Sequence, residues 1–493
     1  VNFRAQQGNN QQGTNLGGTY NFGGLTTNPQ VPAGTGSSLA QMLLGEVASS
    51  GAQRVSGASW AGNSWSGFVQ DDWKVTRRLT LNLGLRGDWQ QRPIERNDGQ
   101  INVDLTQRDP ISGLAGVMVF AGKGGQPRSF LEESYRDFAP RFGWAYDLTG
   151  KGKTVLRGGY GIFYPSIFWR PFFGNTQFFS TSNTNYAALA PGSRAFRFQD
   201  GLPFEPIGVP GAGTPVGALL GQGISIREKE SPTPMTQQWT ASLQHEMAGW
   251  FFEAAYAGNK GNHFASSQRR QLGRSAQDIV ANPLSGRVPG GLGAATVTRE
   301  RTLLPYPQYQ GISVLNPLLG NYNSHQLQLT VRRNFRSGLF VNVAFTGGKK
   351  MSDSNLSPTN DFGFEATGES GFQDGYFNRQ LNRSLDPNDV SKRMAVTLLY
   401  ELPFGKGKKY GGWQVNSIGI MQTGLPLIIR GANNFVSDRP DSTGKSAKID
   451  DPTRARWFDT TAFSNPVEFF LGNVGRTLPD VRTPGTMNWH LSL

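Results

Sequence analysis

Residues 79–86 read Leu-Thr-Leu-Asn-Leu-Gly-Leu-Arg, and this strict alternation is the strongest structural signal in the chain. Successive side chains of an extended strand point to opposite faces, so the leucines share one face while Thr80, Asn82 and Arg86 share the other. The stretch therefore predicts a strand with one apolar and one polar face. The leucines of the apolar face are Leu79, Leu81, Leu83 and Leu85.

The residues before this strand make it half of a hairpin. They carry Trp65, Val69 and Trp73 with polar residues between them, Phe68 being an exception, and the link 75–78 is short enough to require an antiparallel return. A soluble sandwich would turn the leucines inward, toward a second sheet. A membrane barrel would turn them outward, toward lipid, and would line its lumen with the polar set.

The same plan recurs along the chain, with strands joined in pairs by short turns. Candidate hairpins occupy residues 141–164, 239–256, 326–345 and 394–423, and a last candidate strand covers residues 487–493. The long connections, rich in Gly, Pro, Ser and Asn, are residues 90–137, 165–234, 259–321, 347–390 and 431–486. Structureless loops of this size are uncommon in compact soluble domains, whereas outer-membrane barrels combine short periplasmic turns with long extracellular loops. The asymmetry favours the barrel.

Aromatic side chains gather beside the short turns, where a barrel places an interfacial girdle. The girdle candidates are Trp73, Tyr146, Trp250, Tyr400 and Trp413. The lipid-facing candidates are Leu79, Leu81, Leu83, Leu85, Leu327, Leu329, Val341 and Val343. The lumen-facing candidates are Asn82, Arg86, Arg157, Gln328 and Arg332.

The composition fits a β-barrel and excludes other classes. Of 493 residues, 37% are hydrophobic, 11% aromatic and 17% charged, which is little charge for a soluble protein and little hydrophobicity for a helical membrane protein. No run of about 18 apolar residues is present, so we expect no transmembrane helix. The absence of Cys excludes disulfides and thiolate metal sites.

Several segments together carry a family resemblance. They are residues 67–76 (Gly-Phe-Val-Gln-Asp-Asp-Trp-Lys-Val-Thr), 79–86, 139–146 (Ala-Pro-Arg-Phe-Gly-Trp-Ala-Tyr), 156–164 (Leu-Arg-Gly-Gly-Tyr-Gly-Ile-Phe-Tyr), 400–407 (Tyr-Glu-Leu-Pro-Phe-Gly-Lys-Gly) and 412–415 (Gly-Trp-Gln-Val). In this order they resemble the barrel of Oar-like TonB-dependent outer-membrane transporters. The match covers about residues 64–493, and the set is specific although each piece alone is weak.

The resemblance implies a carboxypeptidase-regulatory-like β-sandwich and a plug ahead of a barrel of about 22 strands. No sandwich, plug or TonB box is recognisable here, and we expect about 12 to 16 strands. The chain is therefore expected to be an internal piece of a longer transporter. Residues 1–63 would form an irregular part of the barrel and its loops, with a short amphipathic helix near residues 39–43. Residues 64–493 would form the antiparallel transmembrane β-barrel, incomplete at its C-terminus.

No catalytic or cofactor site is recognisable in the sequence. His245, His263, His325 and His490 are scattered and have no metal-ligand spacing. The glycine-lysine run 405–409 lacks the spacing of a phosphate loop, so we expect a basic periplasmic turn. We expect neither an enzyme nor a cofactor.

One long loop is rich in carboxylates that could bind a cation or a substrate. Because such side chains are mostly exposed in any protein, a solvated loop is the favoured interpretation. The carboxylates are Asp353, Asp361, Glu365, Glu369 and Asp374.

The net charge of +13 has two interpretations. The favoured one is that the cations hold loops and bind lipopolysaccharide phosphates; the other is an electropositive passage for anionic or polymeric substrates. Nucleic acid is not expected as a partner, because the basic residues are dispersed. Beside the arginines of the polar strand faces, Arg269, Arg270 and Arg274 cluster in one loop.

We therefore predict a barrel of a Gram-negative outer membrane that carries out energy-coupled passage of a substrate. The resemblance implies coupling through TonB, ExbB and ExbD by a plug outside this chain, and contact with outer-membrane lipids and lipopolysaccharide. The alternative is a non-transporting adhesin or structural surface barrel. An outer-membrane enzyme would need converging Ser, His and acidic side chains, and the scarcity of His argues against it.

Overall fold

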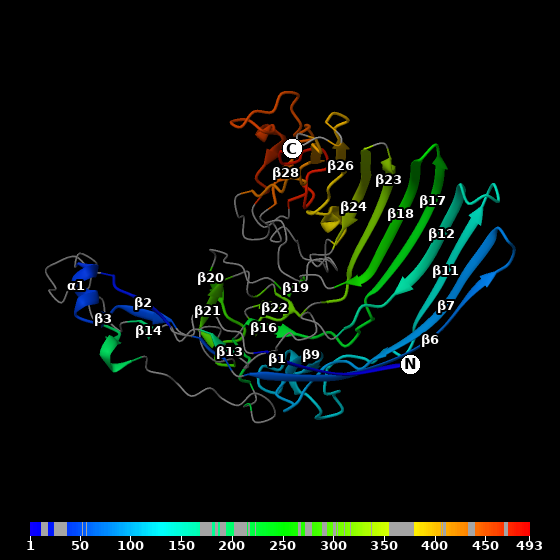
Figure 1. Cartoon of the computed structure of the whole chain (residues 1–493). Helices are drawn as coiled ribbons and strands as arrows, with labels where there is room; N and C mark the ends of the chain where they lie inside the picture. Colours follow the sequence, from blue (N-terminus) through cyan, green and yellow to red (C-terminus); the bar gives the residue numbers. More distant parts are fainter. Residues whose placement is uncertain are drawn as a thin grey trace.

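A curved antiparallel sheet of 14 strands organises the chain (Figure 1). Its strands are β1 (Asn2–Asn10), β6 (Ala58–Lys74), β7 (Leu79–Gln90), β8 (Ile94–Glu95), β11 (Asp137–Asp147), β12 (Thr154–Phe163), β17 (Met235–Met247), β18 (Trp250–Phe264), β23 (Gly320–Arg336), β24 (Leu339–Ser352), β25 (Ser384–Leu385), β26 (Lys392–Glu401), β27 (Gln414–Gln422) and β30 (Thr486–Ser492). Their order is β1-β6-β7-β11-β12-β17-β18-β23-β24-β26-β27-β30, with β8 on β6 and β25 on β24. The large antiparallel sheet confirms the predicted fold class.

The structure is a computed structural model. It describes residues 1–10, 18–23, 37–51, 53–55, 57–167, 180–182, 186–187, 194–201, 214, 217–221, 223–264, 268–271, 279–287, 293–298, 302, 304–309, 311–315, 317–336, 338–353, 379–405, 407, 411–431, 439–467 and 472–493. No helix in these ranges is long and apolar enough to cross a membrane.

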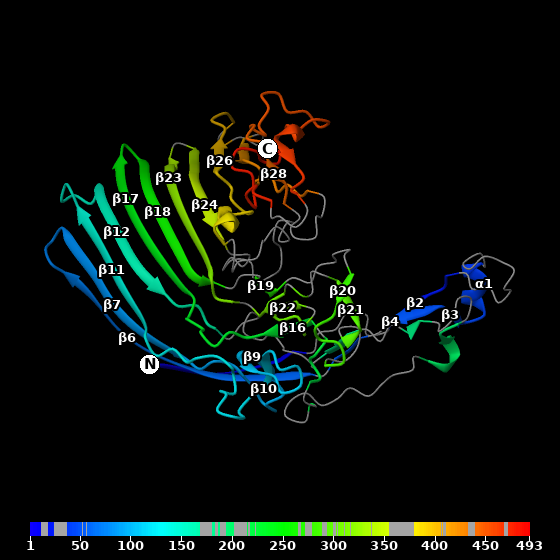
Figure 2. The same ribbon diagram turned by 180° about the vertical axis from the view of Figure 1, so that it is seen from behind.

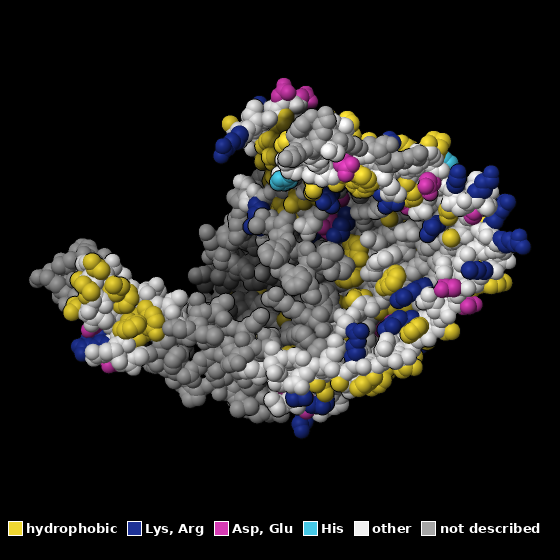
Figure 3. Space-filling model, in the orientation of Figure 1, with side chains coloured by type: hydrophobic (Ala, Val, Ile, Leu, Met, Phe, Trp, Pro, Cys, Tyr) yellow, Lys and Arg dark blue, Asp and Glu magenta, His cyan; other side chains and the backbone are white. Residues whose placement is uncertain are grey.

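The short turns are closed by local hydrogen bonds that their sequences supply. Between β6 and β7, Thr76 Oγ1 accepts the amides of Arg78 and Leu79 at 3.1 and 3.0 Å. Between β11 and β12, Asp147 accepts the amides of Gly150 and Gly152, and both glycines have φ of 70°, which a side chain would disfavour. Lys and Arg side chains gather over the turns at the right of Figure 3.

Residues 1–63, for which the sequence predicts irregular structure, contain β1 and the start of β6 of the large sheet, together with a helix. β1 pairs with β6 from Asn2 opposite Ser66 to Asn10 opposite Ala58. The helix α1 (Ser38–Leu43) forms where the apolar spacing predicts one, but its faces are reversed. Leu43 is 76% exposed, whereas Gln41 is buried and donates to the Glu46 carbonyl.

The long connections contain structure of their own, contrary to the structureless loops that their composition suggests. Three of them share an apolar core that includes Ile101, Leu219 and Ile312. Elements of this part are β9 (Ile101–Arg108), β10 (Ala115–Phe120), β16 (Gly223–Ile226), β19 (Gln268–Gln271), β20 (Ile279–Ala281), β21 (Thr296–Thr298) and β22 (Gly311–Val314). β9 pairs with β10 and β20 with β21 within single connections, whereas β16 pairs in parallel with β22 of another connection and β19 pairs with the other edge of β22.

Two more substructures complete the loops. An arm projects from the sheet at the left of Figure 1 and at the right of Figure 2. It contains α1, β2 (Thr19–Asn21), β3 (Glu46–Val47), β4 (Ser49–Gly51), β14 (Tyr186–Ala187), β15 (Phe196–Arg197) and the 3₁₀ helix Phe198–Asp200. β5 (Gln53–Val55) and β13 (Ser180–Ser182) pair with each other closer to the large sheet. The last connection encloses a core that includes Ala462, Val474 and Leu478. Its elements are β28 (Asp441–Ser442), the 3₁₀ helix Thr460–Ala462 and β29 (Phe463–Ser464), and a 3₁₀ helix at Arg379–Asn382 precedes β25.

Candidate functional site

One row of directly opposed residues crosses the sheet from β7 to β30 without a charged member. Its neighbours face each other in the strand registers, so their side chains lie on one face of the sheet. We call this the apolar face. The row consists of Leu79, Tyr146, Leu156, Leu243, Ala254, Leu329, Phe345, Met394, Met421 and Met487.

The next row along the strands is polar or small throughout. Because neighbouring residues of a strand point to opposite sides, this row lies on the other face, which we call the polar face. The difference between the faces therefore holds across the sheet and not only in β7. The row consists of Thr80, Ala145, Arg157, Ser242, Ala255, Gln328, Thr346, Arg393, Gln422 and Thr486.

The predicted lumen-facing residues share the polar face. Asn82 donates to Asp72 Oδ1 at 2.5 Å, and the Arg86 guanidinium pairs with Asp88 at 2.8 Å. Arg86 also donates to Ser66 Oγ at 2.8 Å. Gln328 and Arg157 stand in the polar row itself. Arg332 lies on the same face, with its guanidinium 5.0 Å from the centre of the Phe251 ring.

Sequence reasoning missed Arg141, which stands on the polar face between two glycines. It lies directly opposite Gly84 on β7 and Gly161 on β12, and its guanidinium is 4.8 Å from the centre of the Phe163 ring. The alternation of residues 141–148 already puts Arg141 with the polar set. A Cβ atom at Gly84 or Gly161 would lie 3.6 Å from the Arg141 side chain, so the two glycines leave space beside it.

The predicted lipid-facing residues share the apolar face and are incompletely covered. Leu85 and Leu327 are each 47% exposed, so neither is packed inside a sandwich of two sheets. Val343 is opposite Val331 on β23 and Val396 on β26, so its row is apolar across the three strands, whereas Val341 is opposite Leu398 on β26 and Arg333 on β23. That these side chains contact lipid stays a prediction.

The girdle candidates lie beside the short turns and on the apolar face. Trp73 is opposite Leu81, and Tyr146 is opposite Leu79. Trp250 begins β18, Tyr400 is next to the last residue of β26, and Trp413 precedes β27. Contact of these rings with lipid headgroups stays a prediction.

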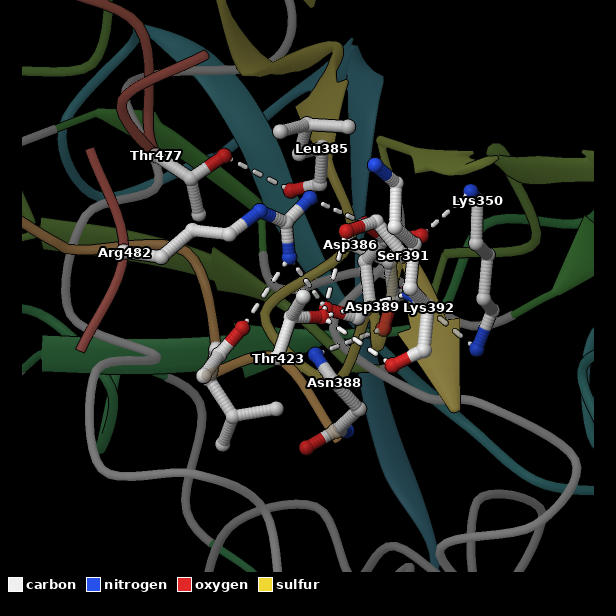
Figure 4. Close-up of polar contacts among 12 residues, drawn as sticks. Lys350, Leu385, Asp386, Asn388, Asp389, Ser391, Lys392, Thr423, Thr477 and Arg482 are labelled. Atoms are coloured by element: carbon white, nitrogen blue, oxygen red, sulfur yellow. Dashed lines mark hydrogen bonds and ion pairs between the residues drawn. The ribbon is translucent and has the colours of Figure 1, made fainter. Parts of the chain in front are cut away.

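At the long-connection end, a buried ion-pair network joins β24 to the segment before β26 and to the segment before β30 (Figure 4). Asp389 is 3% exposed in its side chain and pairs with Arg482 at 2.5 Å. Asp386 is similarly buried and pairs with Lys350 at 3.3 Å. The Lys350 amide donates to Asp389 Oδ1 at 2.6 Å, which connects the two pairs. Figure 4 shows Arg482 pointing toward this group from the last connection.

Two further buried arginines hold the last connection on the same rim. Arg439 donates to Asn382 Oδ1 at 2.6 Å, and Arg476 donates to Ser352 Oγ at 2.6 Å. Arg439 and Arg476 are 1% and 2% exposed, so each satisfies buried oxygens rather than water. The sequence offers no signal for them, because single arginines in a Gly- and Pro-rich loop look solvated.

A third buried arginine, Arg92, ties the first connection to the start of β17. Its guanidinium donates to the Glu132 carbonyl at 2.9 Å and to Thr233 Oγ1 at 3.3 Å, while its amide donates to the Glu133 carboxylate. Burial lowers the pKa of Arg92 despite the nearby carboxylates. Burial also raises the pKa of Glu133, more than its contacts with Arg92 lower it. Loss of water therefore outweighs charge pairing at this site.

Metal binding by imidazole, thiol or carboxylate groups finds no support in the described ranges, which contain no group of three or more His, Cys, Asp or Glu able to hold an ion. Asp353 is buried and accepts the Asn321 amide at 2.5 Å. His245 contacts Thr154 Oγ1 at 2.9 Å and His325 contacts Tyr256 Oη at 2.7 Å. Outside the described residues lie Asp361, Glu365, Glu369, Asp374, Arg274, Lys406, Lys408 and Lys409, and the side chains of Arg269 and Arg270.

A model described as outer membrane beta barrel domain matches residues 1–493. The FrpB iron transporter from Neisseria meningitidis is 9% identical with a TM-score of 0.34, over 76% of this chain and 34% of its own. The outer membrane transporter YddB from Escherichia coli is 11% identical with a TM-score of 0.33, over 78% of this chain and 41% of its own.

A third solved structure is the ferripyoverdine receptor of the outer membrane of Pseudomonas aeruginosa. It is 8% identical with a TM-score of 0.33, over 76% of this chain and 30% of its own. The chain thus spans less than half the length of these proteins. No curated protein matches it.

Proposed function

The chain belongs to the outer membrane beta barrel domain family, and on this premise we propose that it forms the wall of a TonB-dependent transporter that passes an anionic substrate. Its place in the bacterial outer membrane follows from the family. The sheet then has its apolar face toward lipid and its polar face toward an aqueous lumen. The short turns lie on the periplasmic side, and the long connections lie outside the cell.

The observation that carries this proposal is the contrast between the two neighbouring rows. Turning the sheet the other way would put Arg157, Arg393 and Gln328 into hydrocarbon. An Arg near the bilayer midplane costs about 2–4 kcal/mol in such barrels. The same reversal would put the leucine and methionine row into water. Only the orientation with the apolar face toward lipid keeps the arginines out of hydrocarbon and the leucine and methionine row out of water.

The cations of the polar face favour anionic substrates. Arg141, Arg157 and Arg393 are all exposed, and none forms an ion pair within the described ranges. Cations in a channel with low-dielectric walls raise the local concentration of anions. Arg86 differs, because its charge is already paired with Asp88.

Energy coupling rests on the sequence resemblance of segments such as residues 67–76 and 139–146 to the barrel of Oar-like transporters. In that family plan a plug inside the barrel controls passage and contacts TonB, which ExbB and ExbD energise. The long connections would capture substrate outside the cell, and Arg439, Arg476 and Arg482 hold the last of them in place.

A non-transporting adhesin is the second candidate, and a specific feature favours it. The arm around α1 projects away from the sheet and exposes Leu39, Leu43 and Leu44. Exposed apolar side chains on a projecting loop suit contact with another surface. This function would need no energy and no open lumen.

The test measures by mass spectrometry which solutes each of four strains removes from a defined medium. The first strain has the full-length gene, the second lacks this gene, and the third lacks TonB. The fourth has the gene with the substitutions Arg157→Glu and Arg393→Glu. We expect the same anionic solutes to remain in the medium of the last three strains. If the gene deletion leaves solute depletion intact and abolishes surface attachment, the adhesin is correct instead.

A further inference from the structure

Three methionines are neighbours where the apolar row reaches the last strands of the sheet. Met394 on β26 lies directly opposite Met421 on β27, and Met421 lies directly opposite Met487 on β30. Directly opposed residues of antiparallel strands have Cβ atoms about 4.5–5.5 Å apart. Since β26 and β30 are two strand spacings apart, or about 10 Å, the three side chains form one short line. We call these residues the methionine triad.

The triad differs chemically from the earlier part of the same row. Up to β23, the large aliphatic side chains of the row are Leu79, Leu156, Leu243 and Leu329. The next aliphatic side chains, on three adjacent strands, all contain sulfur. The chain has eight methionines in 493 residues, and three of them meet here. An apolar face requires no sulfur, so packing alone does not account for this grouping.

The triad lines one cavity. This cavity has a volume of about 630 Å³ and is also bordered by Phe345, the preceding member of the row, and by the segment before β30. Met394 and Met421 are partly buried, whereas Met487 is 68% exposed. Methionine has three rotatable bonds and fills irregular spaces, so the outer two sulfur atoms can turn toward the middle one. The cavity leaves them room to do so around a bound ion.

The rest of the lining restricts which cation the cavity suits. No Asp or Glu is among the described residues that line it, and the nearby Asp389 is already paired with Arg482. Hard ions such as Ca²⁺ and Mg²⁺ require oxygen ligands, mainly carboxylates. Lys392 and Arg393 also border the cavity, and they repel a divalent ion more strongly than a monovalent one. A soft ion with a single charge fits this set of donors and charges.

We propose that the methionine triad binds Cu(I) through its three thioether sulfur atoms. Thioethers are soft, uncharged donors that favour Cu(I) over hard metals. The described ranges contain no group of three or more His, Cys, Asp or Glu able to hold an ion, but the triad needs none of these residues. The site does not depend on transport or on which face of the sheet meets lipid.

The first experiment measures the affinity of the purified full-length protein for Cu(I), without oxygen and with ascorbate to keep the copper reduced. A coloured Cu(I) chelator competes for the ion, and its absorbance reports how much copper the protein takes. The test variant is Met394→Leu, Met421→Leu, Met487→Leu. Leucine keeps the apolar volume and removes the sulfur, so lost affinity reports coordination and not hydrophobic contact. Circular dichroism checks that the variant folds.

The matched control is Met118→Leu, Met235→Leu, Met247→Leu, which removes the same number of sulfur atoms elsewhere. Like the triad, this set comprises two partly buried side chains and one exposed side chain. We expect the test variant to bind Cu(I) at least about tenfold more weakly than the wild type, because even residues behind the ligands of a metal site contribute that much. The control should bind like the wild type. Equal losses in both variants, or no loss in the test variant, would overturn the proposal.

Selectivity is tested with Zn²⁺ in place of Cu(I). Zinc binds thiolate, imidazole and carboxylate groups, and the triad offers none of them. We expect the wild type and the test variant to bind Zn²⁺ equally. Weaker binding of Zn²⁺ by the test variant would contradict a site that selects a soft monovalent ion.

A second measurement identifies the ligands directly and does not require the test variant to fold. The wild-type protein is labelled with ¹³C in its methionine methyl groups and titrated with Ag(I), a redox-inert ion that prefers the same soft donors. Single leucine variants assign the NMR signals of the triad. We expect the signals of Met394, Met421 and Met487 to shift together before those of the other methionines. Shifts spread evenly over all methionines, or none in the triad, would reject the site.

Discussion

The indole of Trp239 on β17 covers Gly258, its directly opposed neighbour on β18. A Cβ atom at Gly258 would overlap that ring. Trp144 covers Gly158 in the same way, since these residues face each other across β11 and β12. Aromatic rings thus fill the space that glycine leaves on the apolar face, which stabilises strand pairing.

Gly258→Ala should destabilise the barrel because the added methyl group displaces the Trp239 ring. We expect a loss of about 1–3 kcal/mol in the free energy of unfolding. Gly67→Ala is the control, because a Cβ there meets no atom within 4 Å, and its effect should stay within about 0.5 kcal/mol. Urea unfolding in lipid vesicles, followed by tryptophan fluorescence, measures both. Equal effects would contradict the role of the ring.

Cysteine labelling should separate the two faces, and the chain has no Cys of its own to interfere. In membranes, we expect a water-soluble maleimide to label Asn82→Cys and Gln328→Cys. Leu83→Cys and Leu329→Cys should react only with a lipid-soluble reagent, because their side chains face hydrocarbon. Labelling with the opposite pattern would place the lumen on the other side of the sheet.

Arg482→Ala should release the last connection from the rim, because it leaves the Asp389 carboxylate buried without its partner. The expected cost is about 3 kcal/mol, with faster proteolysis between residues 423 and 485 and an intact barrel. Arg454→Ala, at an exposed arginine, serves as control and should change little. Adding Asp389→Asn to Arg482→Ala should restore part of the resistance to proteolysis. No recovery would argue that Arg482 acts by packing instead of by its charge.

Acid should loosen the 3₁₀ helix that begins after Asp459. The Thr461 amide donates to Asp459 Oδ1 at 3.0 Å and holds the pKa of Asp459 below its ordinary value. A carboxyl whose pKa is lowered by folding stabilises above its unfolded pKa, near 4, and that contribution is lost as the pH falls further.

Hydrogen exchange at residues 460–463, corrected for the intrinsic effect of pH, should accelerate below about pH 4. Asp459→Asn keeps an acceptor that does not titrate, so its exchange should not show this step. A step of the same size in the variant would assign the acid sensitivity to another group.

Much of the wall was predictable from the sequence. In residues 79–86 and 326–332, side chains alternate by the geometry of the strand alone, and the turns at Thr76 and Asp147 use hydrogen bonds within a few residues. Such features are local, so one sequence contains them. The apolar and polar sets, the hairpins and their short turns follow from it.

Other features depend on which residues meet across strands or across distant loops. The pairing of β1 with β6 overrides a composition that suggests a loop, because the open edge of β6 offers partners for its backbone groups. The burial of Arg476 and Arg482 requires rim oxygens that lie about a hundred residues away in the chain.

Three lysines near the long connections show the same division. Alternation puts Lys260, Lys349 and Lys392 each on one side of its own strand, but only the strand registers bring them together. The sequence alone determines which way a side chain points, because that is a property of the extended backbone. Which side chains become neighbours is decided by tertiary structure, because register is set by long-range pairing of strands.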